Sequence, residues 1–62
     1  MDPYTVLDLQ NDASIDQIKN SYREKALKYH PKTDNSLEAQ QKFKEISEAY
    51  NMIMEAKNKE QF

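Results

Sequence analysis

Two stretches of the sequence decide the fold: residues 18–31 read IKNSYREKALKYHP, and residues 42–50 read KFKEISEAY. Apolar residues recur in and beside both stretches mostly at three- and four-residue steps, which is the spacing of one face of a helix. In the first stretch and just before it these residues are Ile15, Ile18, Tyr22, Ala26 and Tyr29. In and just after the second they are Phe43, Ile46, Ala49, Tyr50 and Ile53. The pattern predicts two long amphipathic helices.

Capping residues set the limits of these helices. Ser14 is followed three residues later by Gln17, a capping box, so the first long helix is predicted over about residues 14–29. It should end before Pro31, because the residue that precedes a proline is disfavoured in the helical conformation. Asn35 or Ser36 is expected to begin the second long helix, over about residues 36–54.

A short third helix is predicted at the start of the chain, over about residues 3–9, with Asp2 as its N-cap and Pro3 at its first position. The two long helices are joined by a short loop and should therefore pair antiparallel, with the short helix packed across them. The predicted fold class is all-α. The side chains expected in the core are Tyr4, Leu7, Leu9, Ile15, Ile18, Tyr22, Ala26, Phe43, Ile46, Ala49, Tyr50 and Ile53.

Length and composition exclude several kinds of function. The 62 residues are expected to form one domain over 1–62, whose residues 55–62 extend the last helix, form a short extra turn or fray. With no cysteine, one histidine and no glycine, the chain has no means to build a disulfide, a multi-histidine metal centre or a phosphate-binding glycine loop. We therefore expect no catalytic residue, no metal site and no cofactor.

Charge and hydropathy bear on partners and compartment. The net charge of −2 disfavours nucleic-acid binding, which calls for a basic excess. The apolar runs are too short for membrane insertion or a signal peptide. Together with the absence of cysteine, this predicts a reducing intracellular compartment, either cytosol or organelle matrix.

The quoted stretches resemble the J-domain of DnaJ-type co-chaperones. Residues 18–31 resemble the second helix of that family running into its loop, residues 42–50 resemble its third helix, and YTVL at residues 4–7 resembles its first. The resemblance covers residues 2 to about 54 and implies an antiparallel helical hairpin. It also implies that a His-Pro-Asp tripeptide and basic residues of the second helix dock on a seventy-kilodalton heat-shock ATPase and speed its ATP hydrolysis. The family itself has no active site.

The tripeptide of this chain is His30-Pro31-Lys32, which departs from the family pattern. An ammonium group only donates hydrogen bonds, and it would repel a cation that the partner offers to the usual carboxylate. Asp34 lies two residues further on and is a candidate to substitute. However, two residues displace a carboxylate by up to roughly 7 Å, too far for the same short contact unless the loop is rebuilt.

Three further positions depart from the family pattern. Glu24 stands where a second basic residue is common, Asp8 where a glycine often follows the first helix, and Lys25 where an apolar residue is usual. The Lys25 stem is expected to point outward. The candidate partner-binding residues are Lys19, Arg23, Lys28, His30, Pro31 and Lys32.

Each candidate also has a purely structural interpretation. His30 is expected to shape the loop, in preference to contacting a partner directly. The basic residues of the helix form either a recognition face or a solvated surface. Met52 and Met54, with Phe62, form either a soft patch for a partner or part of a frayed terminus.

Three functions are consistent with these features. Because the chain resembles a J-domain but has a lysine in the tripeptide, the first and favoured function is a degenerate J-like adaptor, regulator or structural subunit. Such a domain would have lost ATPase stimulation and would bind a larger assembly or another J-protein. The second is a working co-chaperone of a seventy-kilodalton heat-shock chaperone, or an engineered variant of one. The third, a nucleic-acid-binding three-helix domain, is disfavoured by the negative net charge.

Overall fold

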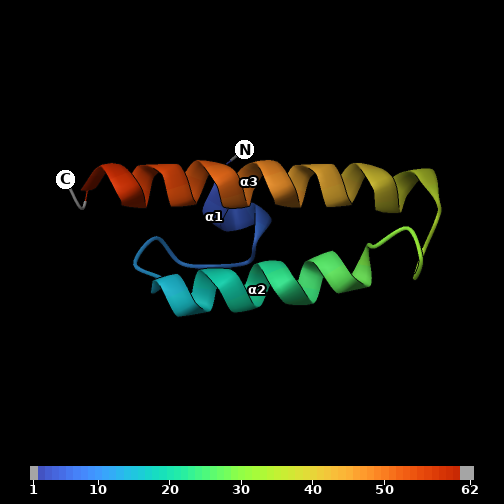
Figure 1. Cartoon of the computed structure of the whole chain (residues 1–62), viewed down its shortest axis with the longest axis horizontal. Coiled ribbons are helices and arrows are strands. Elements are labelled where there is room, and N and C mark those ends of the chain that lie inside the picture. The colour runs from blue at the N-terminus through green and yellow to red at the C-terminus, as the bar shows by residue number, and fades with distance from the viewer. Residues whose placement is uncertain (1, 61–62) are drawn as a thin grey trace.

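The computed structural model describes residues 2–60, which form the helices α1 (Pro3–Val6), α2 (Ile15–Lys28) and α3 (Leu37–Glu60). In Figure 1, α2 and α3 lie alongside each other in opposite directions, and α1 packs against α3. The predicted all-α hairpin with a short N-terminal helix is confirmed.

Helix α1 is shorter than predicted. Its start is as expected, because the Asp2 carboxylate accepts a hydrogen bond from the Tyr4 backbone N–H at 3.0 Å. Its predicted end at residue 9 is wrong, because the helix stops at Val6. Asp8 has a φ of 57°, a left-handed conformation that ends a right-handed helix.

Helix α2 begins and ends where the capping residues predict. The Ser14 hydroxyl accepts the Gln17 N–H at 3.1 Å, and the Gln17 side chain accepts the Ser14 N–H at 2.8 Å. The capping box is therefore confirmed. Tyr29 is the C-cap, just ahead of the loop that contains Pro31.

Helix α3 begins after Ser36 and continues beyond the predicted end at residue 54. The Ser36 hydroxyl accepts the Ala39 N–H at 3.1 Å, so Ser36 rather than Asn35 caps the helix. At the other end residues 55–60 extend the helix, where Lys59 and Glu55 lie one turn apart with 3.9 Å between Nζ and Oε1. Of the predicted alternatives, residues 55–60 thus have the extended helix, and Phe62 lies outside the described residues.

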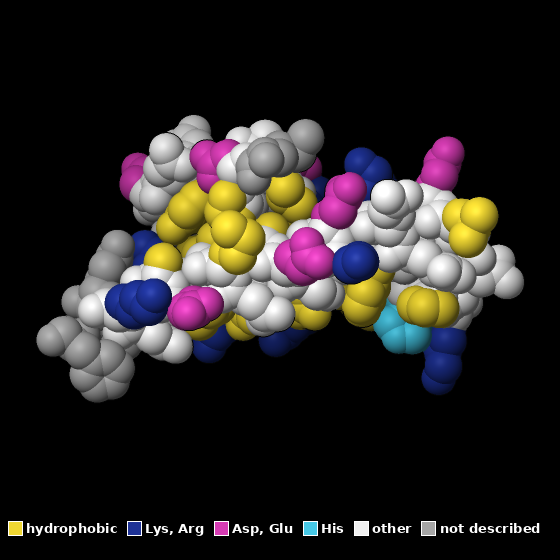
Figure 2. All heavy atoms as spheres, turned by 90° about the horizontal axis from the view of Figure 1, so that it is seen from above, with side chains coloured by type: hydrophobic (Ala, Val, Ile, Leu, Met, Phe, Trp, Pro, Cys, Tyr) yellow, Lys and Arg dark blue, Asp and Glu magenta, His cyan; other side chains and the backbone are white. Residues whose placement is uncertain are grey.

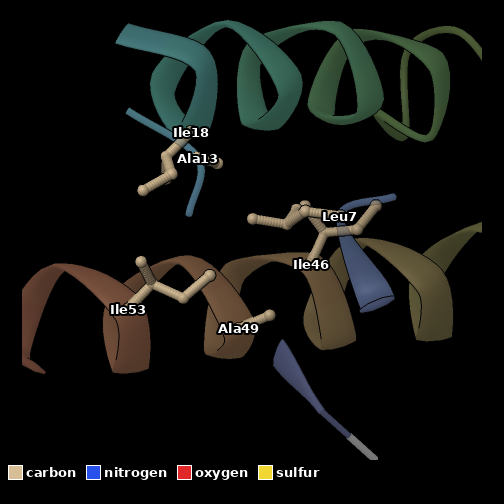
Figure 3. Close-up of a cluster of buried hydrophobic side chains, with 6 residues drawn as sticks. All are labelled: Leu7, Ala13, Ile18, Ile46, Ala49 and Ile53. Carbon is tan, nitrogen blue, oxygen red and sulfur yellow. The ribbon is translucent and has the colours of Figure 1, made fainter. Parts of the chain in front are cut away.

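The core is smaller than the predicted set. Figure 3 shows its six clustered side chains, which come from α2, α3 and the segments between α1 and α2: Leu7, Ala13, Ile18, Ile46, Ala49 and Ile53. Ala39 is also buried. Five of these were predicted, whereas two were missed: Ala13 lies ahead of α2, and Ala39 lies ahead of the predicted apolar stripe of α3.

The remaining predicted core residues are only half-buried: Tyr4, Leu9, Ile15, Tyr22, Ala26, Phe43 and Tyr50. A chain this short leaves much of its apolar surface exposed, so large rings pack at the rim. There Tyr22 of α2 stacks on Tyr50 of α3, with ring centroids 4.4 Å apart and ring planes 22° from parallel.

Candidate functional site

The loop between α2 and α3 is organised around His30. The His30 carbonyl accepts the backbone N–H groups of Thr33 at 2.8 Å and Asp34 at 2.9 Å. Its ring nitrogen Nδ1 accepts the Lys32 backbone N–H at 3.2 Å. A neutral imidazole that accepts at Nδ1 carries its hydrogen on Nε2, so the outer ring nitrogen is a donor.

The His30 ring also rests on α3. It meets the Phe43 ring edge-on, with centroids 6.0 Å apart and planes at 86°. Hydrogen bonds within the loop and this ring contact hold the histidine in place from two sides. The predicted role of His30 in loop geometry is therefore visible, whereas its contact with a partner remains a prediction.

Lys32 and Pro31 are exposed at the tip of the loop. Within residues 2–60, no ion pair to Lys32 is formed. The backbone of Lys32 is held by His30, and its ammonium group is left to solvent. The loop therefore presents a cation at its tip.

The Asp34 side chain lies at the end of the loop, beside the start of α3. Its Oδ1 accepts the Ser36 backbone N–H at 3.0 Å, just ahead of α3. This hydrogen bond holds the pKa of the Asp34 carboxyl below its ordinary value. The Asp34 carboxylate thus accepts a backbone N–H just before the first residue of α3.

Two of the basic candidates of α2 share a groove with His30. The groove is about 360 Å³ and lies between α2 and α3. It is lined by Lys19, Tyr22, Arg23, Ala26, Leu27, His30, Phe43 and Tyr50. The other candidates, Lys28, Pro31 and Lys32, are absent from this lining; the Lys28 ammonium lies 5.4 Å from the centroid of the Tyr29 ring.

The apolar floor of this groove was not predicted to have a functional role. Phe43 and Tyr50 were predicted as core, but they are half-buried and line the groove. Leu27 falls outside the apolar stripe of its helix and is 65% exposed. A leucine outside the apolar stripe and between basic residues of one helix was the sequence feature that could have indicated this groove.

Other kinds of site are not found among the described residues. No three of their His, Asp and Glu side chains come together in a way that could hold a metal ion. No helix within residues 2–60 combines the length and apolarity needed to cross a membrane.

Fold and site together describe a small helical hairpin whose connecting loop and adjacent basic groove face solvent. Residues 2–62 match the DnaJ domain family, so the chain belongs to the J-domain family that the quoted stretches resemble. This is a family of non-enzymatic co-chaperone domains.

Full-length relatives carry the same domain. The chain is 46% identical over 61 residues to "DnaJ protein homolog 1" of Drosophila melanogaster, covering 98% of this chain and 18% of the relative. It is 44% identical over 61 residues to "Chaperone protein DnaJ" of Methanosarcina mazei, covering 98% and 16%. It is 47% identical over 62 residues to "Chaperone protein DnaJ" of Clostridium botulinum, covering 98% and 17%.

The chain therefore spans less than a fifth of the length of these relatives. No solved structure matches it.

Proposed function

We propose that this J-domain acts as a co-chaperone that docks on a seventy-kilodalton heat-shock chaperone through the groove between α2 and α3. The proposal is supported by the identity to proteins named DnaJ along the whole domain. This support favours a working co-chaperone over the adaptor that the lysine of the tripeptide suggested. The observation that carries the proposal is the groove itself, which joins Lys19, Arg23 and the loop residue His30.

The charge of the groove fits an acidic partner surface. Lys19 and Arg23 lie one turn apart and are both exposed, and no carboxylate lines the groove with them. Such a one-sign surface raises the rate of encounter with a surface of the opposite sign. We therefore expect docking to weaken as salt is added.

The floor of the groove supplies apolar anchors. Leu27 is exposed, and the rings of Tyr22 and Phe43 are half-buried beside it. Aromatic and basic side chains that become fully desolvated are the usual centres of binding energy in protein interfaces. The groove combines both kinds of residue around His30.

A second candidate function, the adaptor without ATPase stimulation, is favoured by Lys32. Its ammonium replaces the carboxylate that the resemblance implies, and Asp34 is engaged by Ser36. Docking through α2 does not require a carboxylate at residue 32. The two candidates therefore differ in whether docking speeds ATP hydrolysis.

Single-turnover ATP hydrolysis by a seventy-kilodalton heat-shock chaperone tests the proposal. The wild-type chain is compared with Lys32→Asp, with Arg23→Ala in the groove, and with Lys44→Ala as an exposed control outside it. We expect the wild type to stimulate hydrolysis, Lys32→Asp to stimulate it more strongly, Arg23→Ala to reduce stimulation and Lys44→Ala to leave it unchanged.

Other outcomes separate the candidates. An inert wild type together with an active Lys32→Asp variant would support the adaptor, silenced at one residue. If both chains are inert and neither binds the chaperone, the docking proposal is wrong. Stimulation that survives Arg23→Ala would show that the groove between α2 and α3 is not the contact.

A further inference from the structure

A second groove lies on a different side of α3, where α1 packs against it. Its floor is apolar and consists of Pro3, Val6, Ala49 and Met52, and two carboxylates, Glu45 and Glu48, border it. The groove has a volume of about 250 Å³. Figure 2 shows hydrophobic side chains gathered on this face next to acidic ones.

This groove is separate from the one between α2 and α3. At 3.6 residues per turn, positions 45, 48 and 52 lie on the side of α3 roughly opposite to positions 43 and 50. Phe43 and Tyr50 line the basic groove, and no residue lines both. The two surfaces can therefore be occupied or mutated independently.

Among the residues that line this second groove, Met52 leaves apolar surface in water. Its side chain is 57% exposed, whereas Ala49 beneath it is buried. Pro3 and Val6 of α1 are half-buried and complete the apolar floor. An unbranched, flexible methionine adapts to partner side chains of different shapes, and such residues recur at binding surfaces.

The acidic border continues along α3 as a stripe. Exposed residues at alternating three- and four-residue steps share this face of the helix: Glu38, Gln41, Glu45, Glu48, Met52 and Glu55. At the start of the stripe the basic side chain of Lys42 lies beside Glu38 and Glu45. The net charge of −2 thus conceals two separate faces, one basic on α2 and one acidic on α3.

We propose that the groove between α1 and α3 binds an amphipathic helical segment of a partner protein, with apolar side chains flanked by lysine and arginine. An apolar floor at helical spacing accepts apolar anchors of a helix laid along it. The carboxylates Glu45 and Glu48 select flanking cations and disfavour an acidic segment. This proposal does not depend on docking through α2, because the two grooves share no residue.

A synthetic peptide probes the groove in the whole 62-residue chain, labelled with nitrogen-15 and followed by NMR. The peptide has leucines at three- and four-residue steps flanked by lysine and arginine. One control is a scrambled peptide of the same composition, and another replaces lysine and arginine by glutamate. We expect the amide shifts to cluster at Val6, Glu45, Glu48 and Met52, with a Kd at least about tenfold lower than for either control.

Variants locate the contact. Met52→Ser and Glu48→Lys should each raise the Kd severalfold, and together about tenfold or more. Leu27→Ser removes an apolar side chain that is 65% exposed, against 57% for Met52, from the basic groove and should leave the Kd unchanged. Circular dichroism checks that each variant keeps its helices.

The proposal would be overturned by equal affinity for the scrambled peptide, by shifts that cluster at Lys19, Arg23 and Leu27, or by a Kd that the Met52 and Glu48 variants leave unchanged. Shifts at the groove that depend on protein concentration without peptide would assign the surface to a second copy of this chain and would also overturn it.

Discussion

The Nζ atom of Lys25 lies 2.6 Å from Oδ2 of Asp8, and this ion pair ties α2 to the turn that follows α1. The fold brings these two residues, 17 positions apart in the chain, into contact. Lys25 was expected to point outward, but its side chain is only 24% exposed, while that of Asp8 is 78% exposed. The lysine stem lines a recess with Val6 and Tyr29, and its ammonium group reaches the carboxylate at the rim.

A second side chain of α2 secures the same turn. The Ser21 hydroxyl donates a hydrogen bond to the Leu7 carbonyl at 2.6 Å, one helical turn before Lys25. Leu7 is fully buried, so its carbonyl has little access to water and needs this partner. Two contacts from one helix thus hold the turn against α2.

The left-handed backbone of Asp8 predicts different outcomes for two substitutions. Asp8→Gly and Asp8→Ala both remove the ion pair with Lys25. Only glycine adopts a φ of 57° without a steric penalty from Cβ. We expect the alanine variant to unfold at a lower urea concentration than the glycine variant. Equal midpoints, or a more stable alanine variant, would contradict this account of the turn.

The free energy of unfolding should decrease in acid because of two carboxyls. Lys25 lowers the pKa of Asp8, mainly through their hydrogen bond, and the Ser36 N–H lowers the pKa of Asp34, in both cases from an ordinary value of 3.8. A folded-state pKa below the unfolded one contributes stability that is complete above the unfolded value and is lost as pH falls through the folded value. Urea midpoints measured at neutral pH and below about pH 3 should show this loss.

Salt distinguishes the two carboxyls in that experiment. The Asp8 contribution includes charge attraction to Lys25, and smaller ones to Lys28 and Lys42, which salt screens. The Asp34 contribution comes from a hydrogen bond donated by a backbone N–H, which salt screens less than an ion pair. Asp8→Asn should therefore remove the salt-sensitive part of the acid effect, and Asp34→Asn the salt-resistant part. The reverse pattern would contradict these causes.

Adjacent residues of α3 should differ sharply in their contribution to stability. Ile53 is 2% exposed and Met52 is 57% exposed. Ile53→Ala leaves a cavity in the core and should cost about 2–5 kcal/mol, enough to unfold much of so small a domain. Met52→Ala should change the free energy of unfolding by at most about 0.5 kcal/mol. Urea unfolding followed by circular dichroism measures both, and similar losses would contradict the position of the core.

The capping box of α2 should make a measurable contribution to the free energy of unfolding. Ser14→Ala removes the acceptor of the Gln17 N–H and should destabilise the domain by about 1 kcal/mol. Ser14→Asp keeps an acceptor at the cap and places a negative charge near the positive end of the helix dipole, so it should retain most of the stability. Thermal unfolding of the three chains tests this order, and an alanine variant as stable as the aspartate variant would contradict it.

The sequence predicted the elements well where the signals are local. The limits of α2 follow from Ser14, Gln17 and Pro31, each of which acts within a few residues along the chain. The apolar steps around Ile18 and Ile46 placed one face of each long helix in the core correctly. The KFKEISEAY stretch also led to the family.

Predictions were wrong where the structure depends on contacts between segments that are far apart in the chain. The end of α1 at Val6 depends on the turn that Lys25 and Ser21 hold from α2. Ala39 is buried near the start of α3, ahead of the apolar stripe that the sequence analysis placed in the core. Half-burial of the aromatic rings depends on how little core a chain of this length can enclose.

For the candidate site, too, some features follow from the sequence and others only from the tertiary structure. Sequence alone predicted the three helices, the caps of α1 and α2, the family and the basic residues of α2, because these follow from residue type and spacing along one helix. Only the tertiary structure decided that Asp8 meets Lys25, that Lys19, Arg23 and His30 share a groove, and that α1 and α3 enclose another. Such neighbours are set by the packing of helices far apart in the chain, which residue spacing within one helix does not encode.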